Sequence, residues 1–243
     1  MAALREGPVQ DVTEEHITLR VDGQSVPAFH ARPDGMPQTG VVLHPDIGGP
    51  RPLFYDLARR LATHGFAVIC PEPFWRLRDD QKSSLEARMG AVPDLDDGQQ
   101  LADLETAADR LVLEDDVGIV SVLGFCIGGY YTFKAAAGDR FDRAVAFYGM
   151  LRTPPNWKSP GHTDPLDHAS DVCPTLAIFG SNDSFTPPDD IEALRAKWAG
   201  NPHCEIIVVE GAEHGFVHDP DRPTHRADDA AKVWDRALDW MKA

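Results

Sequence analysis

The stretch GIVSVLGFCIGG, residues 118–129, decides how this sequence folds. Its first eight residues form a short, mostly apolar run of the kind that makes a buried strand. Glycines flank Cys126 on both sides where the run ends, and a helix-like segment follows to residue 137. Small flanking residues let a strand and a helix pass close together, so we expect a sharp strand-to-helix turn with Cys126 at its tip.

This turn suggests nucleophilic chemistry. A cysteine at a helix N-terminus lies in a field that favours its thiolate. The backbone N–H of Ile127 would then point at a developing oxyanion. The string is the G-x-nucleophile-x-G pattern, with cysteine in place of the commoner serine. A glycine-rich turn that merely carries a buried cysteine would give the same string, so partner residues have to be found.

The rest of the chain alternates between strand-like and helix-like segments. An opening pair of alternating segments, 16–23 and 25–33, surrounds an Asp-Gly turn and predicts an antiparallel hairpin. Short apolar runs then alternate with helical patterns, which predicts an α/β fold with a mostly parallel central sheet, helices on both faces and a single domain over 1–243. Two regions rich in proline, 72–99 and 151–171, are expected to be long loops. The predicted strands cover 40–44, 66–70, 118–125, 144–149, 175–180 and 205–211, and the predicted helices 51–64, 100–113, 126–137, 189–198 and 227–241.

Two further residues follow later strands in the order that a catalytic triad requires. The strand-like run TLAIFG leads to Asp183, and EIIVVEG leads to His214. Because the carboxyl ends of parallel strands meet at one edge of a sheet, we expect both side chains near Cys126. Alone, Asp183 could be a turn residue and His214 a surface histidine. Together they predict a Cys126–Asp183–His214 triad.

Composition excludes several classes of protein. There are 23 Lys and Arg against 39 Asp and Glu, a formal net charge of −16, which repels nucleic acids and anionic membranes. No apolar run is long enough to span a bilayer, and residues 1–16 contain no signal-peptide core, so we expect a cytoplasmic protein. The cysteines and histidines show no metal-binding spacing, so no metal is expected. We expect a monomer or a small homo-oligomer.

Three motifs resemble those of one family. The turn GFCIGG at 124–129, the segment GSNDSFTP at 180–187 and the triplet HGF at 214–216 look like those of dienelactone hydrolases, also called carboxymethylenebutenolidases. The resemblance runs over essentially the whole chain, and cysteine at the turn is its most specific feature. It implies an α/β-hydrolase fold and the hydrolysis of a small ester or lactone without a cofactor.

The resemblance also implies roles for residues outside the triad. Asp46 matches a carboxylate that hydrogen-bonds the resting thiol, and the Ile47 N–H matches a second oxyanion donor. Arg76 resembles an arginine that clamps a substrate carboxylate, and Trp75 beside it is expected to shape the substrate pocket. With Asp46 nearby, Cys126 is expected to rest largely as a thiol.

Two departures from the family pattern concern the substrate. Asp46 stands where the family's best-studied pattern has Glu, and His218 stands where a second carboxylate-binding Arg would fall. A histidine holds a carboxylate less firmly than an arginine and is mostly neutral at pH 7. We therefore expect neutral esters or lactones to be hydrolysed at least as well as carboxylated ones, with His218 binding substrate.

Two rival interpretations remain open at the level of sequence. The chain could be a catalytically silent relative that binds a small ligand in the same pocket. It could also be a thiol redox sensor, although no second cysteine lies close to Cys126 in the sequence. An intact triad argues against both, because a silent pocket has no physical need for all three groups.

Overall fold

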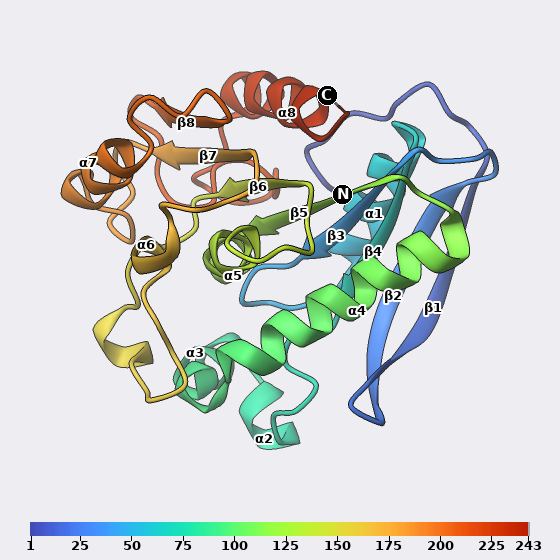
Figure 1. Cartoon of the computed structure of the whole chain (residues 1–243), viewed down its shortest axis with the longest axis horizontal. Coiled ribbons are helices and arrows are strands. Elements are labelled where there is room, and N and C mark those ends of the chain that lie inside the picture. Colours follow the sequence, from blue (N-terminus) through green and yellow to red (C-terminus); the bar gives the residue numbers. More distant parts are fainter. Residues whose placement is uncertain (243) are drawn as a thin grey trace.

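The computed structural model describes residues 1–242 and contains an eight-stranded sheet in the order β1-β2-β4-β3-β5-β6-β7-β8 (Figure 1). β1 pairs with β2, and β2 with β4, in antiparallel fashion, and the other neighbours are parallel. This arrangement confirms the predicted mostly parallel sheet with an N-terminal hairpin. The strands are β1 Val12–Val21, β2 Gln24–Pro33, β3 Thr39–His44, β4 Phe66–Pro71, β5 Ile119–Phe125, β6 Arg143–Phe147, β7 Thr175–Gly180 and β8 Cys204–Val209.

The hairpin turns at Asp22 and Gly23, which both have positive φ values of 49° and 78°. Two successive residues with positive φ match the right-handed twist of the flanking strands, and an Asp-Gly pair adopts this conformation at low cost. The sequence signal at this turn therefore has a direct conformational cause.

Helices cover both faces of the sheet, as Figure 1 shows. Alternate residues of β3 enter different cores: Val41 and Leu43 pack with α1 and α8, whereas Val42 packs with α4 and α5. Because successive side chains of a strand point to opposite faces of the sheet, a continuous apolar run contributes to the cores on both faces. No helix within residues 1–242 is both long and apolar enough to cross a membrane. The longer helices are α1 Pro52–Thr63, α4 Asp97–Asp115, α5 Ile127–Ala136, α7 Pro188–Lys197 and α8 Ala227–Lys242.

The registers of the parallel strands bring the predicted site residues to one edge of the sheet. His44 at the end of β3 pairs with Gly124, and Phe125 at the end of β5 pairs with Phe147. The segments that follow β3, β5 and β6 therefore start at the same level. Open α/β sheets place their ligands at this edge.

The region 72–99, predicted to be a loop, contains short helices instead. Ser84 caps α3 by accepting a hydrogen bond from the Ala87 N–H at 3.0 Å, and Asp96 caps α4 in the same way through Gln99. Such caps stabilise the first turn of a helix, and α3 with its seven residues is too short to show an apolar period. The short elements here are α2 Asp79–Lys82, α3 Leu85–Ala91 and the 3₁₀ turn η1 Val92–Asp94; those in the 151–171 region are η2 Pro155–Trp157 and α6 Pro165–His168.

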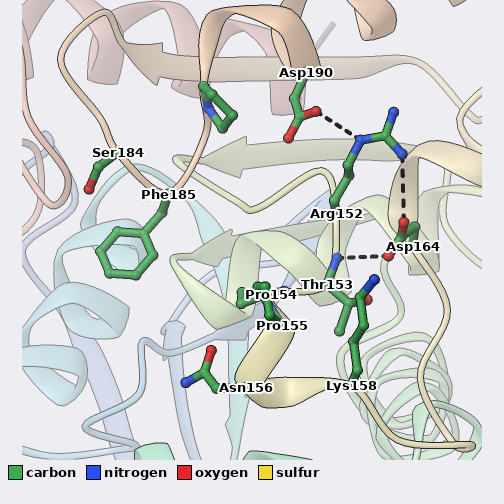
Figure 2. Close-up of a pocket in the computed structure, with 11 residues that line it drawn as sticks. Arg152, Thr153, Pro154, Pro155, Asn156, Lys158, Asp164, Ser184, Phe185 and Asp190 are labelled. Atoms are coloured by element: carbon green, nitrogen blue, oxygen red, sulfur yellow. Dashed lines mark hydrogen bonds and ion pairs between the residues drawn. The ribbon is translucent and has the colours of Figure 1, made fainter.

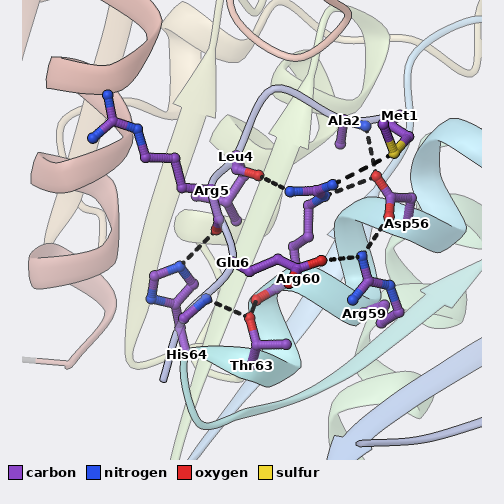
Figure 3. A network of polar contacts seen from close by, with 11 residues as sticks. Met1, Ala2, Leu4, Arg5, Glu6, Asp56, Arg59, Arg60, Thr63 and His64 are labelled. Atoms are coloured by element: carbon purple, nitrogen blue, oxygen red, sulfur yellow. Dashed lines mark hydrogen bonds and ion pairs between the residues drawn. The ribbon is translucent and has the colours of Figure 1, made fainter. Parts of the chain in front are cut away.

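The N-terminal segment lies along α1 (Figure 3). The Ala2 N–H donates to Asp56 Oδ2 at 2.7 Å, and Arg60 Nη1 donates to the Leu4 carbonyl at 2.8 Å. The Ala3 N–H donates to the carbonyl of His218 at 3.1 Å. This segment therefore links α1 to the loop that follows β8, which carries His214 and His218.

Candidate active site

Cys126 lies at the sharp turn between β5 and α5, with φ 58° and ψ −117°. The flanking glycines are required by contact: a Cβ on Gly124 would come within 2.2 Å of the Gly128 carbonyl oxygen. A Cβ on Gly128 would lie 2.3 Å from the carbonyl oxygen of His44. The predicted strand-to-helix turn is confirmed, and it holds a non-glycine residue in a strained backbone conformation.

Asp183 and His214 come together from the turns that follow β7 and β8. His214 Nδ1 donates to Asp183 Oδ2 at 2.7 Å, and Asp183 Oδ1 accepts a hydrogen bond from the Phe185 N–H at 2.9 Å. The Asp183 side chain is fully buried and that of His214 is 14% exposed. The acid is thus fixed by its own turn and orients the imidazole ring.

The surroundings of His214 favour its charged form. Burial lowers the pKa of His214, but the negative charge of nearby Cys126 and the charge and hydrogen bond of Asp183 outweigh burial and raise it to about 10. Nε2 is buried and makes no hydrogen bond within residues 1–242, so it is available to the sulfur or to a substrate oxygen. This electrostatic balance suits a base that must hold a proton beside a thiolate.

Two backbone N–H groups at this edge are free to donate. Ile127 begins α5 and Ile47 lies in the loop after β3, and neither N–H makes a hydrogen bond within residues 1–242. The two segments are in contact, because a Cβ on Gly128 would also lie 2.6 Å from the Pro45 carbonyl oxygen. Paired free N–H groups of this kind can stabilise an oxyanion.

Asp46 holds the loop that carries Ile47. Its Oδ1 accepts from the Gly48 N–H at 2.8 Å, while Arg51 reaches both carboxylate oxygens at 2.6 and 2.9 Å. His218 Nε2 donates to Oδ2 at 2.9 Å. Burial raises the pKa of Asp46, but the hydrogen bonds from His218 and Arg51 and the positive charge of Arg51 hold it well below its usual range. Cys126 is not among its hydrogen-bond partners within residues 1–242, which differs from the expected contact with the thiol.

His218 lies inside the protein, which differs from the substrate-binding role predicted from the sequence. Its side chain is fully buried, and its Nδ1 is hydrogen-bonded to the hydroxyl of Tyr148. Burial lowers the pKa of His218 in spite of its hydrogen bond to Asp46. Both ring nitrogens are therefore occupied, and a charged form is disfavoured.

Tyr148 is a site residue that the sequence analysis did not identify. It follows β6 with a positive φ of 41°, and its ring lies 5.0 Å from the ring of His214, edge to face. It also connects to His218 through its hydroxyl. The sequence signal that could have identified Tyr148 is its position directly after the strand AVAF, at the sheet edge where the triad residues meet.

Arg76 is paired with an acidic side chain of the chain itself. Its two Nη atoms donate to the carboxylate of Asp103 at 2.5 and 2.9 Å, and the guanidinium lies 4.2 Å from the ring centroid of Trp75. Trp75 Nε1 donates to the same carboxylate at 2.9 Å. The guanidinium expected to clamp a substrate carboxylate is thus already neutralised within the protein.

The sheet order, the strained turn after β5 and the edge at which these side chains meet define a hydrolase of the α/β-hydrolase fold. A sequence profile described as "Dienelactone hydrolase family" matches residues 26–243. This chain belongs to the dienelactone hydrolase family, whose members act on lactone and ester bonds, and the resemblance inferred from its motifs is confirmed.

Individual relatives agree over most of the chain. It is 36% identical over 232 residues to a "Putative carboxymethylenebutenolidase" of Escherichia coli strain K12, covering 90% of this chain and 83% of the relative. It is 28% identical to a "Carboxymethylenebutenolidase" of Rhodococcus opacus, over 95% and 92% of the two chains. A solved "Putative Dienelactone Hydrolase" from Klebsiella pneumoniae superposes with a TM-score of 0.87 at 31% identity, over 96% of this chain and 99% of the other.

Proposed function

We propose that this protein hydrolyses a small, uncharged ester or lactone through a Cys126–His214–Asp183 triad. The observation that carries the proposal is the 2.7 Å hydrogen bond between His214 and Asp183 at the sheet edge where Cys126 occupies the strained turn. A nucleophile, a base and an orienting acid in this order are the requirements for acyl transfer.

The reaction proceeds in two halves. The thiol proton of Cys126 passes to His214, and the resulting thiolate attacks the carbonyl carbon. The N–H groups of Ile127 and Ile47 stabilise the oxyanion. The tetrahedral intermediate collapses, the carbon–oxygen bond to the alcohol breaks, and protonated His214 gives its proton to the leaving oxygen. Neutral His214 then takes a proton from water, the hydroxide attacks the thioester, and the acid and the Cys126 sulfur are released.

The preference for uncharged substrates rests on the two positions where a carboxylate clamp was expected. Arg76 is neutralised by Asp103, and His218 is buried with both nitrogens occupied. With 16 excess negative charges on the chain, an anionic substrate gains no compensating attraction at either position.

Trapping of the acyl-enzyme tests the proposal. With 4-nitrophenyl acetate, mass spectrometry is expected to find acetylation on Cys126, and Cys126→Ala is expected to lose turnover. Alkylation should also reach Cys126 first, because burial raises the pKa of Cys173 to about 11 and also raises that of Cys204. Cys204→Ser is the matched control and should keep wild-type activity.

Full activity after stoichiometric alkylation of Cys126 would refute the triad. Ligand binding without any turnover would favour a silent relative, and reversible oxidation of Cys126 without turnover would favour a redox sensor.

A further inference from the structure

A cavity of about 510 Å³ lies between the loop that follows β6 and the turn that follows β7 (Figure 2). The first wall comes from residues 152–158 and the second from Ser184, Phe185 and Pro187. A volume of this size lies within the range of small-molecule sites, which is about 300–1,000 Å³. The mechanism described above does not use this cavity.

The cavity begins beside the catalytic base. Phe185 lines it, and the ring centroid of Phe185 lies 4.8 Å from that of His214. Phe185 also belongs to the turn of Asp183, whose carboxylate accepts the Phe185 N–H. A group bound in the cavity would therefore extend away from His214.

The charges that line the cavity cancel. Arg152 Nε donates to Asp190 at 2.8 Å, and its Nη1 lies 3.7 Å from Asp164, as Figure 2 shows. Lys158 lines the cavity as a second cation. Two cations and two carboxylates leave no net charge, so a bound carboxylate or ammonium would gain little here.

The remaining lining is apolar with a few free polar groups. Pro154, Pro155 and Pro187 lie opposite or beside Phe185 and give flat apolar surfaces that suit an aromatic ring. Asn156 and Ser184 also line the cavity, and an amide or a hydroxyl group can donate a hydrogen bond to an oxygen atom of a ligand.

The loop 152–163, which contains the first wall of the cavity, is held in place by a network of hydrogen bonds. Lys134 Nζ donates to Asp97 at 2.5 Å, and the same Asp97 oxygen accepts from the Thr163 N–H at 2.9 Å. The Tyr130 hydroxyl is 3.0 Å from Thr153 Oγ1. The cavity is thus formed before any ligand arrives, which lowers the entropic cost of binding.

We propose that this cavity receives the alcohol portion of the substrate, and that this portion is uncharged and partly aromatic. The inference rests on the proposed function, because His214 has to lie within hydrogen-bond reach of the leaving oxygen that it protonates. The leaving alcohol is therefore the part of the substrate nearest to His214 and Phe185. In a lactone, the same place would take the substituent on the carbon that bears the ring oxygen.

Two isomeric esters test whether the cavity binds the alcohol portion or the acyl portion of the substrate. Benzyl acetate carries its ring on the alcohol, and methyl phenylacetate carries the same ring on the acyl group. We expect kcat/KM to be at least about tenfold higher for benzyl acetate, the lower end of the discrimination that such a pocket supplies. Asn156→Trp, which fills the rim, should lower kcat/KM for benzyl acetate about tenfold and leave methyl phenylacetate within about threefold.

The matched control is His168→Trp, which places the same side chain at an exposed position of α6, outside the cavity. It should leave both esters at wild-type rates. A preference for methyl phenylacetate that Asn156→Trp removes would overturn the inference and assign the cavity to the acyl group. Equal effects of Asn156→Trp on both esters would also overturn it.

Binding of an alcohol alone separates this inference from the proposed function. Fluorine NMR of 4-fluorobenzyl alcohol with Cys126→Ala should show binding that Asn156→Trp in the same background weakens at least about tenfold. Alcohol binding without hydrolysis of any ester would refute the proposed hydrolysis and support the ligand class of the cavity. Hydrolysis without alcohol binding would leave the triad standing and overturn the inference.

Discussion

His214 and His218 lie four residues apart on one loop, and each is hydrogen-bonded to an aspartate, yet their pKa values shift in opposite directions. His214 donates to Asp183 at 2.7 Å and has a pKa raised to about 10. His218 donates to Asp46 at 2.9 Å and has a lowered pKa. The difference lies in the neighbours. Cys126 adds negative charge beside His214, whereas Arg51 neutralises Asp46 and His218 is fully buried.

The comparison shows that a His–Asp hydrogen bond does not by itself define a catalytic pair. A buried imidazole stays neutral when its carboxylate partner already has a cation, because desolvation then dominates. The same residue types therefore form a proton-holding pair at His214 and a structural pair at His218.

The largest expected effect comes from removing the negative charge at His214. Asp183→Asn should preserve the fold and lower kcat by roughly 10⁴, by analogy with the serine-protease triad, because the amide stabilises the wrong imidazole tautomer. Steady-state kinetics with 4-nitrophenyl acetate measures this loss. Unchanged kcat in the Asn variant would mean that another acid orients His214, with Glu213 the first to test.

An Asp→Asn substitution in the Asp46–His218 pair should affect the loop that carries Ile47 and the stability of the fold. Asp46→Asn leaves Arg51 without its carboxylate and loosens the loop that carries Ile47. We expect kcat to fall only about tenfold with little change in KM, and the free energy of unfolding to fall by about 2 kcal/mol. Urea denaturation and kinetics measure the two effects. A loss of kcat as large as that of Asp183→Asn would remove the proposed distinction between the pairs.

The pH dependence of His218 sharpens the comparison without changing the chemistry. Its pKa is lower in the folded chain than the value of about 6.5 expected when unfolded, so the unfolded chain binds the proton more readily. The contribution of neutral His218 to the free energy of unfolding is therefore present above about pH 6.5 and is progressively lost as pH falls below it. Urea titrations should show this acid-side slope, and His218→Gln should flatten it.

His218 is thus expected to take up a proton less readily than an ordinary histidine as pH falls, contrary to the role in substrate binding expected from the sequence. The ratio of kcat/KM for carboxylated and neutral esters should then stay constant between pH 7.5 and 6. NMR titration of the ring gives a direct measurement. Protonation of His218 near pH 6, with a matching gain for carboxylated esters, would restore the expectation from the sequence.

The smallest expected effect concerns Arg76. Because its guanidinium is paired with buried Asp103, Arg76→Ala should change the ratio of kcat/KM for carboxylated and neutral esters by less than about twofold. The thermal midpoint should fall, since Asp103 loses its cation. A selective loss for carboxylated esters, with neutral esters unaffected, would show that Arg76 leaves Asp103 to bind substrate.

Much of the fold could be predicted because its signals are local. The apolar runs locate the strands, the Asp-Gly pair locates the hairpin turn, and the glycines around Cys126 fix the turn before α5. These features depend on backbone sterics and on periods of a few residues, which the sequence states directly. The short helices in 72–99 were not predicted, because a helix of four to seven residues is too short to show an apolar period.

The sequence by itself determined the α/β order and the positions of Cys126, Asp183 and His214 after β5, β7 and β8. Only the tertiary structure decided that Asp46 pairs with Arg51 and His218, that Arg76 pairs with Asp103, and that Tyr148 stands between the two histidines. Asp46 and His218 are 172 residues apart in the chain. Which carboxylate meets which cation, and how dry that contact is, depends on the packing of distant segments, and these two factors set the pKa of each group.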